Sequence, residues 1–156
     1  MVKKTLAVQE RELGELLVPT VRLFCEDVAQ GQDGGCYIAR IIDQIGTPQV
    51  PVTAQRFTVF MEFEKAKNVF DKDIHGLKLA LRLTAPDEVT HDLGTLELSP
   101  NSERETEFQR IVMSIPGITF KSFGIYNFSL HIMNAKRESL LTARKLKVVE
   151  MKVLPE

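Results

Sequence analysis

Apolar and polar residues alternate with a period of two along much of this chain. In residues 77–84, leucines alternate with Lys, Ala, Arg and Thr, and in residues 57–64 the odd-numbered positions are Phe, Val, Met and Phe. A helix would scatter these apolar side chains around its circumference, whereas a strand places them on one side. Both segments are therefore predicted to be β-strands with one buried face.

Further strands are predicted from shorter patterns of the same kind, at residues 18–25, 36–42, 93–98, 108–115, 125–133 and 142–149. Segment 36–42 is apolar at both odd and even positions, which predicts a strand covered on both faces. The Gly- and Asp-rich stretch 26–35 is predicted to be a loop. Pro48 and Pro51 exclude a central strand and favour an extended crossing between sheets. The alternation shifts near Arg144, which predicts a β-bulge there.

This makes about eight strands with no long amphipathic helix between them, so parallel βαβ units are disfavoured. A chain of 156 residues with this pattern is predicted to be an all-β protein, an antiparallel β-sandwich of the immunoglobulin-like type. The charged residues 1–15 have weak periodicity and are predicted to be a short N-terminal extension, with a short helix over 8–17. Residues 16–156 form the predicted sandwich domain.

The most specific local motif is Gly124-Ile125-Tyr126, which opens an alternating strand. A Gly two residues before such a Tyr resembles the tyrosine corner of immunoglobulin-like sandwiches, where the Tyr hydroxyl bonds back to backbone a few residues upstream. We assign Gly124 and Tyr126 a structural role. A buried Tyr in any other sandwich is the alternative.

From about residue 17 the chain resembles an uncharacterised bacterial domain family of unknown function. The segments that carry this resemblance are 23–28, 36–43, Pro51 before the strand at Phe57, 81–87 and 120–130. They are strand ends, turns and the Gly-x-Tyr corner. The resemblance implies a sandwich and adds no catalytic residue.

The net charge and the two cysteines indicate which kinds of partner and which compartment to expect. Twenty basic residues balance twenty-one acidic ones for a net charge of −1, so no general basic field favours nucleic acid. The chain has neither a secretory signal pattern nor an apolar run long enough to cross a membrane, which predicts a cytoplasmic protein. Cys25 and Cys36 are then predicted to be reduced, buried thiols, although a hairpin between them would make a disulfide geometrically possible.

Motifs for chemistry are lacking. No Gly-x-Ser-x-Gly elbow or phosphate loop occurs, and His75, His91 and His131 lack the spacing of metal ligands. The acidic groups of the loops at 26–33 and 71–73 are too few for calcium. We therefore expect no cofactor, no metal and no enzymatic activity, and rank a hydrolytic or metal-dependent enzyme third among the possible functions.

The preferred hypothesis is a non-enzymatic module that binds another protein or self-associates as a homodimer. Phe60 lies on the polar side of its strand, Phe70 in a charged loop and Phe123 just before the corner, so these rings are candidates for a protein-binding surface. Packing under loops is the alternative for them. Arg144 and Lys147 of the last strand are expected to join one face, where they protect a sheet edge and are further candidates for the protein-binding surface. The alternative function is a receptor for a small ligand, a nucleotide or sugar, with a pocket built from the loops at 26–35, 65–75 and 100–107.

Overall fold

The computed structural model describes residues 11–33, 35–99 and 108–152, and almost all of its regular structure is β. Its elements are β1 (Leu17–Gln30), β2 (Cys36–Ile42), β3 (Gln44–Thr47), β4 (Val52–Ala54), β5 (Thr58–Lys65), α1 (Asp71–Ile74), β6 (Lys78–Thr84), β7 (Thr90–Glu97), β8 (Phe108–Ser114), β9 (Ile118–Phe120), β10 (Gly124–Met133) and β11 (Glu138–Glu150).

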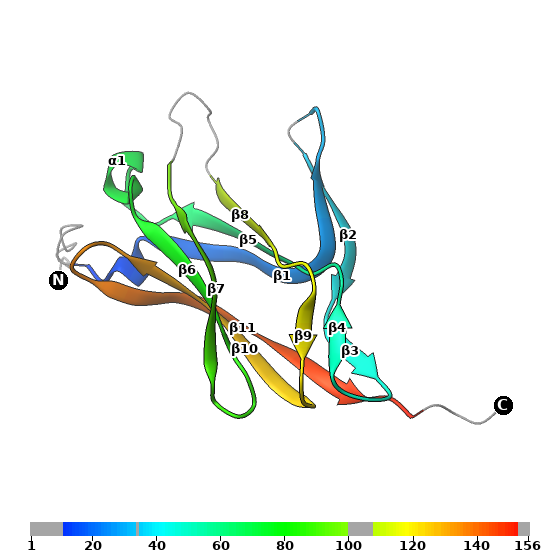
Figure 1. Ribbon diagram of the computed structural model, residues 1–156. Helices are drawn as coiled ribbons and strands as arrows, with labels where there is room; N and C mark the ends of the chain where they lie inside the picture. Colours follow the sequence, from blue (N-terminus) through cyan, green and yellow to red (C-terminus); the bar gives the residue numbers. More distant parts are fainter. Residues whose placement is uncertain (1–10, 34, 100–107, 153–156) are drawn as a thin grey trace, which may run out of the picture.

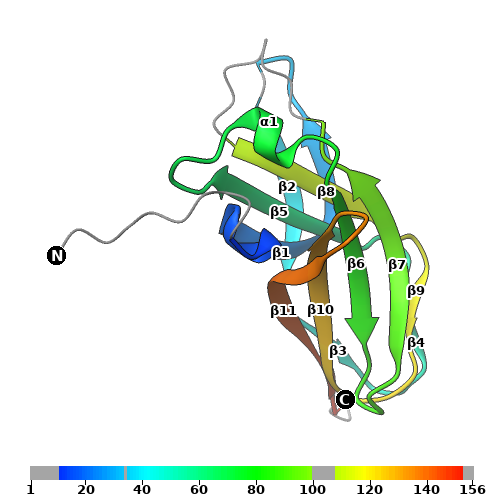
Figure 2. The same ribbon diagram turned by 90° about the vertical axis from the view of Figure 1, so that its left-hand side faces the viewer.

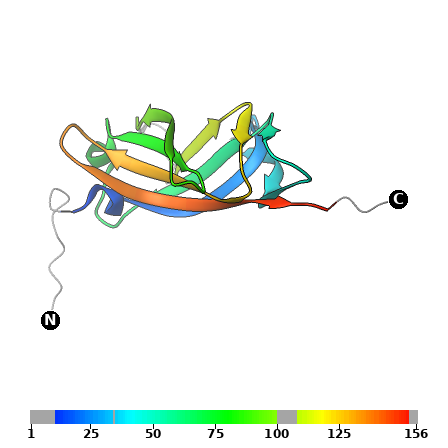
Figure 3. The same cartoon turned by 60° about the horizontal axis from the view of Figure 1, so that its bottom comes forward.

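These strands form two large sheets that pack face to face, which confirms the predicted all-β sandwich (Figures 1 and 2). One sheet has the order β2-β1-β5-β8 and the other the order β3-β11-β10-β6-β7, while β4 and β9 form a small third sheet. The neighbours are antiparallel except β3 and β11, which run parallel. The long strand β11 extends along the length of the sandwich (Figure 3).

The strand pairing resembles that of an immunoglobulin sandwich. There, strands C, F and G are neighbours in one sheet, and B and E are neighbours in the other. Here β6, β10 and β11 are neighbours in the same sequence order, and β5 pairs with β8. Strand β2 is an addition to this plan, because it pairs with β1 at the far side from β5.

An aromatic cluster joins the two sheets. The ring of Phe24 on β1 lies 4.7 Å from that of Phe128 on β10, and Phe57 lies 5.4 Å and 5.5 Å from them, respectively. All three side chains are at most 1% exposed. Alternate residues of β5 and β6 add to this core, as the period of two predicts; they are Val59, Met61, Phe63, Leu79, Leu81 and Leu83.

The corner before β10 has the contact that the Gly-x-Tyr motif predicts. The Tyr126 hydroxyl donates to the carbonyl oxygen of Ser122 at 2.9 Å, and the Ser122 N–H donates to the same hydroxyl at 3.1 Å. Gly124 has a φ of +134°, a conformation that L side chains rarely adopt, and a Cβ there would lie 2.9 Å from Pro86 Cγ. Both residues thus fix the entry of β10 into its sheet.

Several sequence expectations need correction. Strand β1 continues to Gln30, so the loop expected at 26–35 is shortened to a turn after residue 30. Strands β3, β4 and β9 were not expected; β3 and β4 lie on either side of residues 48–51 and belong to different sheets. The expected helix over 8–17 is only a 3-10 turn at Leu13–Glu15 within the described residues, and residues 8–10 lie outside them.

The last strand also differs from its prediction. β11 is not an edge near its end, because Lys147 and Val148 pair with both β10 and β3, and residues 149 and 150 pair with β3. The irregularity lies a few residues before Arg144: the register shifts between the pairs Leu130–Thr142 and His131–Leu140, so Leu141 is the extra residue.

The corner contact makes a stability prediction. Tyr126→Phe removes both backbone hydrogen bonds of a buried hydroxyl, so the free energy of unfolding should fall by about 1–2 kcal/mol. Tyr37→Phe is the matched control, because the Tyr37 side chain is 63% exposed. Urea denaturation followed by circular dichroism measures both. Equal stability of the two variants would contradict the role assigned to Tyr126.

Candidate protein-interaction surface

The hairpin β1–β2 projects from one side of the sandwich (Figure 1). Its turn is closed by the Gly31 N–H, which donates to the Gly35 carbonyl at 2.7 Å, and by the Gly35 N–H, which donates to Asp33 Oδ1 at 2.9 Å. From there the register runs from Gln30 opposite Cys36 to Phe24 opposite Ile42. The Gly- and Asp-rich segment therefore makes the tight turn that returns β2 along β1.

Strand β2 is an exposed apolar edge strand. Tyr37 is 63% exposed, Ile41 57% and Ile38 37%. The prediction that segment 36–42 is covered on both faces is therefore wrong. β2 pairs with β1 alone among the described strands, so its other side has unpaired backbone groups.

Apolar side chains continue from β2 across the outer face of the same sheet. Ile41 lies opposite Cys25, and in the next row Leu23 lies opposite Phe60 and Phe60 opposite Val112. Opposed residues of antiparallel strands point to the same face, so these side chains form one surface. We call Leu23, Tyr37, Ile41, Phe60 and Val112 the apolar outer face.

Phe60 lies at the centre of this face but is only 3% exposed, so its prediction as an exposed ring is wrong. The guanidinium of Arg110 lies 5.9 Å from the ring centroid, and the same group bonds to Glu62 at 2.8 Å. A cation over an aromatic ring is a stabilising contact. Phe60 is thus the buried centre of this face. The side chains that are exposed to solvent are those of Tyr37, Ile41 and Val112.

The two edges of the five-stranded sheet, β3 and β7, are better protected against pairing than β2. β3 has only four residues, and β7 exposes Thr90, His91 and Asp92 and has a register shift against β6. β8, the other edge of the four-stranded sheet, has seven residues and one charge, Arg110, which is ion-paired with Glu62. Short length, charges and irregular register are common protections of sheet edges. β2 likewise has seven residues and a single charge, Arg40, which bonds to Glu26 at 2.8 Å and has a φ of +48°.

The two cysteines are both free. Cys25 is fully buried, and burial raises the pKa of its thiol, with a further increase from Asp27. That thiol therefore stays protonated at neutral pH. Cys36 is only half-buried, so its predicted burial is not met. The two residues do not face each other, because Cys36 lies opposite Gln30 and Cys25 opposite Ile41.

Two adjoining cavities lie beside β2. One of about 380 Å³ is bounded by β2, β3 and β4, and another of about 300 Å³ shares Glu26, Gln55 and Arg56 with it. Arg40 also lines the larger cavity. Of the three loops predicted to build a pocket, residues 26–30 are instead part of β1, and residues 100–107 lie outside the described parts of the chain.

The residues predicted to form a binding surface are not brought together. Phe70 is 61% exposed and precedes α1, with Lys72 Nζ 5.9 Å from its ring centroid, whereas Phe123 is half-buried against the core. Arg144 lies opposite Phe128 and points inward, with its guanidinium 6.0 Å from the Phe24 ring. Lys147 is exposed and lies opposite Ile125, on the outer face of the five-stranded sheet. Arg144 and Lys147 therefore do not share a face.

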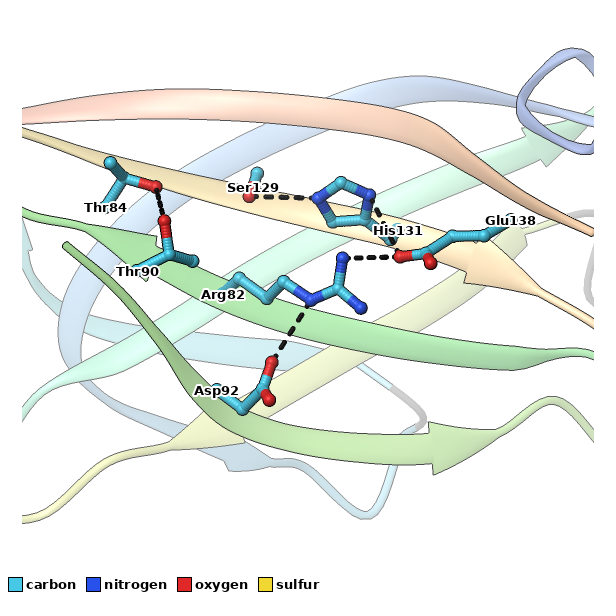
Figure 4. A network of polar contacts seen from close by, with 7 residues as sticks. All are labelled: Arg82, Thr84, Thr90, Asp92, Ser129, His131 and Glu138. Atoms are coloured by element: carbon cyan, nitrogen blue, oxygen red, sulfur yellow. Dashed lines mark hydrogen bonds and ion pairs between the residues drawn. The ribbon is translucent and has the colours of Figure 1, made fainter. Parts of the chain in front are cut away.

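A polar network crosses the outer face of the five-stranded sheet (Figure 4). Arg82 on β6 bonds to Asp92 on β7 at 3.1 Å and to Glu138 on β11. His131 on β10 lies 3.5 Å from Glu138 through Nδ1 and 3.2 Å from Ser129 Oγ through Nε2. The network thus connects four neighbouring strands.

The order Ser129, His131, Glu138 is that of a nucleophile, a base and a carboxylate, which the sequence analysis did not identify. Burial lowers the pKa of His131 below 6.5, and the positive charge of Arg82 lowers it further. The carboxylates of Glu138 and Asp92 raise this pKa, but by less. The imidazole is therefore neutral at pH 7. However, Ser129 is only 8% exposed, and none of these side chains lines either cavity described above. These contacts hold neighbouring strands of the sheet together, and this structural role explains the arrangement.

Two further classes of feature are not found. Within residues 11–33, 35–99 and 108–152, no group of three or more His, Cys, Asp or Glu side chains is placed to hold a metal ion. The same part of the chain contains no helix that is long and apolar enough to cross a membrane.

By its fold and surface, the protein is a two-sheet β-sandwich whose strand β2 is an exposed apolar edge. Residues 20–146 match a family described as "Family of unknown function (DUF6941)". The chain therefore belongs to this family. This confirms the resemblance to a family of unknown function that the sequence showed. A search of curated proteins finds no match.

The partly buried His131 makes a prediction about pH. Because its folded pKa lies below 6.5, the unfolded chain takes up a proton at His131 before the folded one does. Stability should therefore fall as the pH decreases through and below 6.5. His131→Asn removes this contribution, so its urea midpoint should depend less on pH over this range than that of the wild type. An unchanged slope of stability against pH would contradict the assignment.

Proposed function

We propose that this chain is a non-enzymatic β-sandwich module that binds protein, and that β2 with the apolar outer face is its binding surface. The observation that carries the proposal is that β2 is a sheet edge with Tyr37 and Ile41 more than half exposed. The partner is another protein or a second copy of this chain.

The physical argument combines backbone and side chains. An incoming extended strand forms main-chain hydrogen bonds with the free side of β2, as in recognition by strand addition. At the same time it covers apolar side chains that water now contacts, which favours association. Both contributions occur at the same edge, where a bound strand would continue the apolar outer face.

We also propose a cytoplasmic location. Cys36 is free and half-buried, so a reducing compartment would keep it from forming disulfides with other chains.

A charge placed on β2 tests the proposal. Ile41→Lys puts an ammonium on the binding surface and should abolish association, because burying an unpaired charge is costly. Ile125→Lys is the matched control: Ile125 is 49% exposed, compared with 57% for Ile41, and lies on the other sheet. The measurement is recovery of partner chains, identified by mass spectrometry, on immobilised wild type and both variants.

The expected result is the same set of bound proteins on wild type and Ile125→Lys and its loss on Ile41→Lys. Thermal unfolding shows whether both variants are folded. Identical binding by all three proteins would overturn the proposed surface.

A receptor for a small ligand is the second candidate, favoured by the cavity of about 380 Å³ that Arg40 and Arg56 line. Guanidinium groups bind phosphate well, which fits a nucleotide or a sugar phosphate. This candidate predicts that such a ligand raises the melting temperature of the wild type but not of Arg56→Gln. A panel of nucleotides and sugars that gives no thermal shift would eliminate it.

A further inference from the structure

We infer that the strand bound at the β2 edge is β2 of a second copy of this chain, paired antiparallel about a twofold axis at Ala39. This inference rests on the proposed function, because it uses the same edge and the same apolar outer face. It adds the identity of the partner and the register of pairing.

Symmetry limits the possible registers. When two identical edge strands pair antiparallel about a twofold axis, residue i of one lies opposite residue j of the other and the reverse also holds. Opposed side chains point to the same face of the sheet. The axis must therefore pass through a residue of β2. Ile38, Ala39 and Arg40 are the candidates near the middle of the strand.

The sequence of β2 favours one of these three registers. An axis at Arg40 places two guanidinium groups opposite each other, and like charges directly opposite are destabilising. An axis at Ile38 leaves the end of the strand unpaired and sets Arg40 opposite Cys36 of the second copy. An axis at Ala39, the midpoint of Cys36–Ile42, sets the two strands side by side along their whole length, and the regular pairing is interrupted only at Arg40, whose φ is +48°.

The Ala39 register also gives the best side-chain pairs. Tyr37 of each copy lies opposite Ile41 of the other, so an aromatic ring meets a β-branched side chain on both sides of the axis. Such cross-strand pairs stabilise sheets. At the axis the small side chains of Ala39 meet, which leaves room for the tyrosine rings. The apolar outer faces then continue across the axis as a single surface.

Charge does not oppose this assembly. Arg40 is the only charged residue of β2, and Glu26 of the same chain lies 2.8 Å from it. The two edges therefore approach without strong repulsion. An interface made by one pair of edge strands is small, so dimerisation should depend on protein concentration.

Engineered disulfides test the register. Directly opposed residues of antiparallel strands have Cα atoms about 4.5–5.5 Å apart, within the range of disulfides. Ala39→Cys, in a Cys36→Ser background, should therefore give a covalent dimer on mild oxidation. The background has Cys25 as its only remaining thiol, which is fully buried and should not react.

Two controls locate the axis. Ile38→Cys in the same background should show loss of the covalent dimer, because residue 38 then lies opposite Arg40. Wild-type Cys36 should also fail to cross-link, since the Ala39 register sets it about 20 Å from its counterpart. Preferential cross-linking of Ile38→Cys, or a monomeric Ala39→Cys variant at the highest concentration tested, would overturn the inference.

The experiments distinguish a failure of the self-pairing from a failure of the proposed binding surface. If Ala39→Cys stays monomeric while Ile41→Lys loses an identified partner that Ile125→Lys retains, the self-pairing is wrong and the binding surface stands. If neither substitution at β2 has an effect, both proposals fail. A covalent Ala39→Cys dimer, whose formation Ile41→Lys prevents, supports both.

Discussion

The contact of Phe24 with Phe57 and Phe128 positions strand β1 between the rest of the sandwich and its free edge. The three rings lie within 5.5 Å of one another and are almost completely buried, so they hold β1 against the opposite sheet. One side of β1 pairs with β5, and the other pairs with β2. Because the core fixes β1, it also fixes an apolar strand that no described element covers. The core packing thus positions the free edge on which the proposed function depends.

The alternation of apolar and polar residues with a period of two predicted the strands that have one buried face. In residues 77–84 the leucines that alternate in sequence are the side chains that fill the core. The short strands β3, β4 and β9 have only three or four residues, too few to establish a period, and their pairing comes from tertiary contacts. The corner at Gly124 and Tyr126 was predictable because both signals are local: a backbone conformation that suits Gly and a hydroxyl that bonds four residues upstream.

From the sequence, a protein-binding surface was expected, but the residues now proposed to form it were not identified. Phe60 was chosen because its neighbours in sequence are polar. It does lie on the outer face of the sheet, but its side chain is only 3% exposed, with Arg110 near its ring. Tyr37 and Ile41 were overlooked because an apolar pattern at both odd and even positions is typical of a strand covered on both faces. The same pattern also fits a strand that a partner covers, and a single sequence does not say which layer lies over it.

Hydrogen exchange of the β2 backbone amides, measured over a dilution series, tests the central claim most directly. The N–H groups of β2 that point away from β1 have no partner strand among the described residues, and they become hydrogen-bonded when a second chain pairs with the edge. The account predicts that these amides exchange rapidly in dilute solution and slowly at high protein concentration, while the amides of β10 are unaffected. Exchange in β2 that is fast at every concentration would contradict pairing between two copies at this edge.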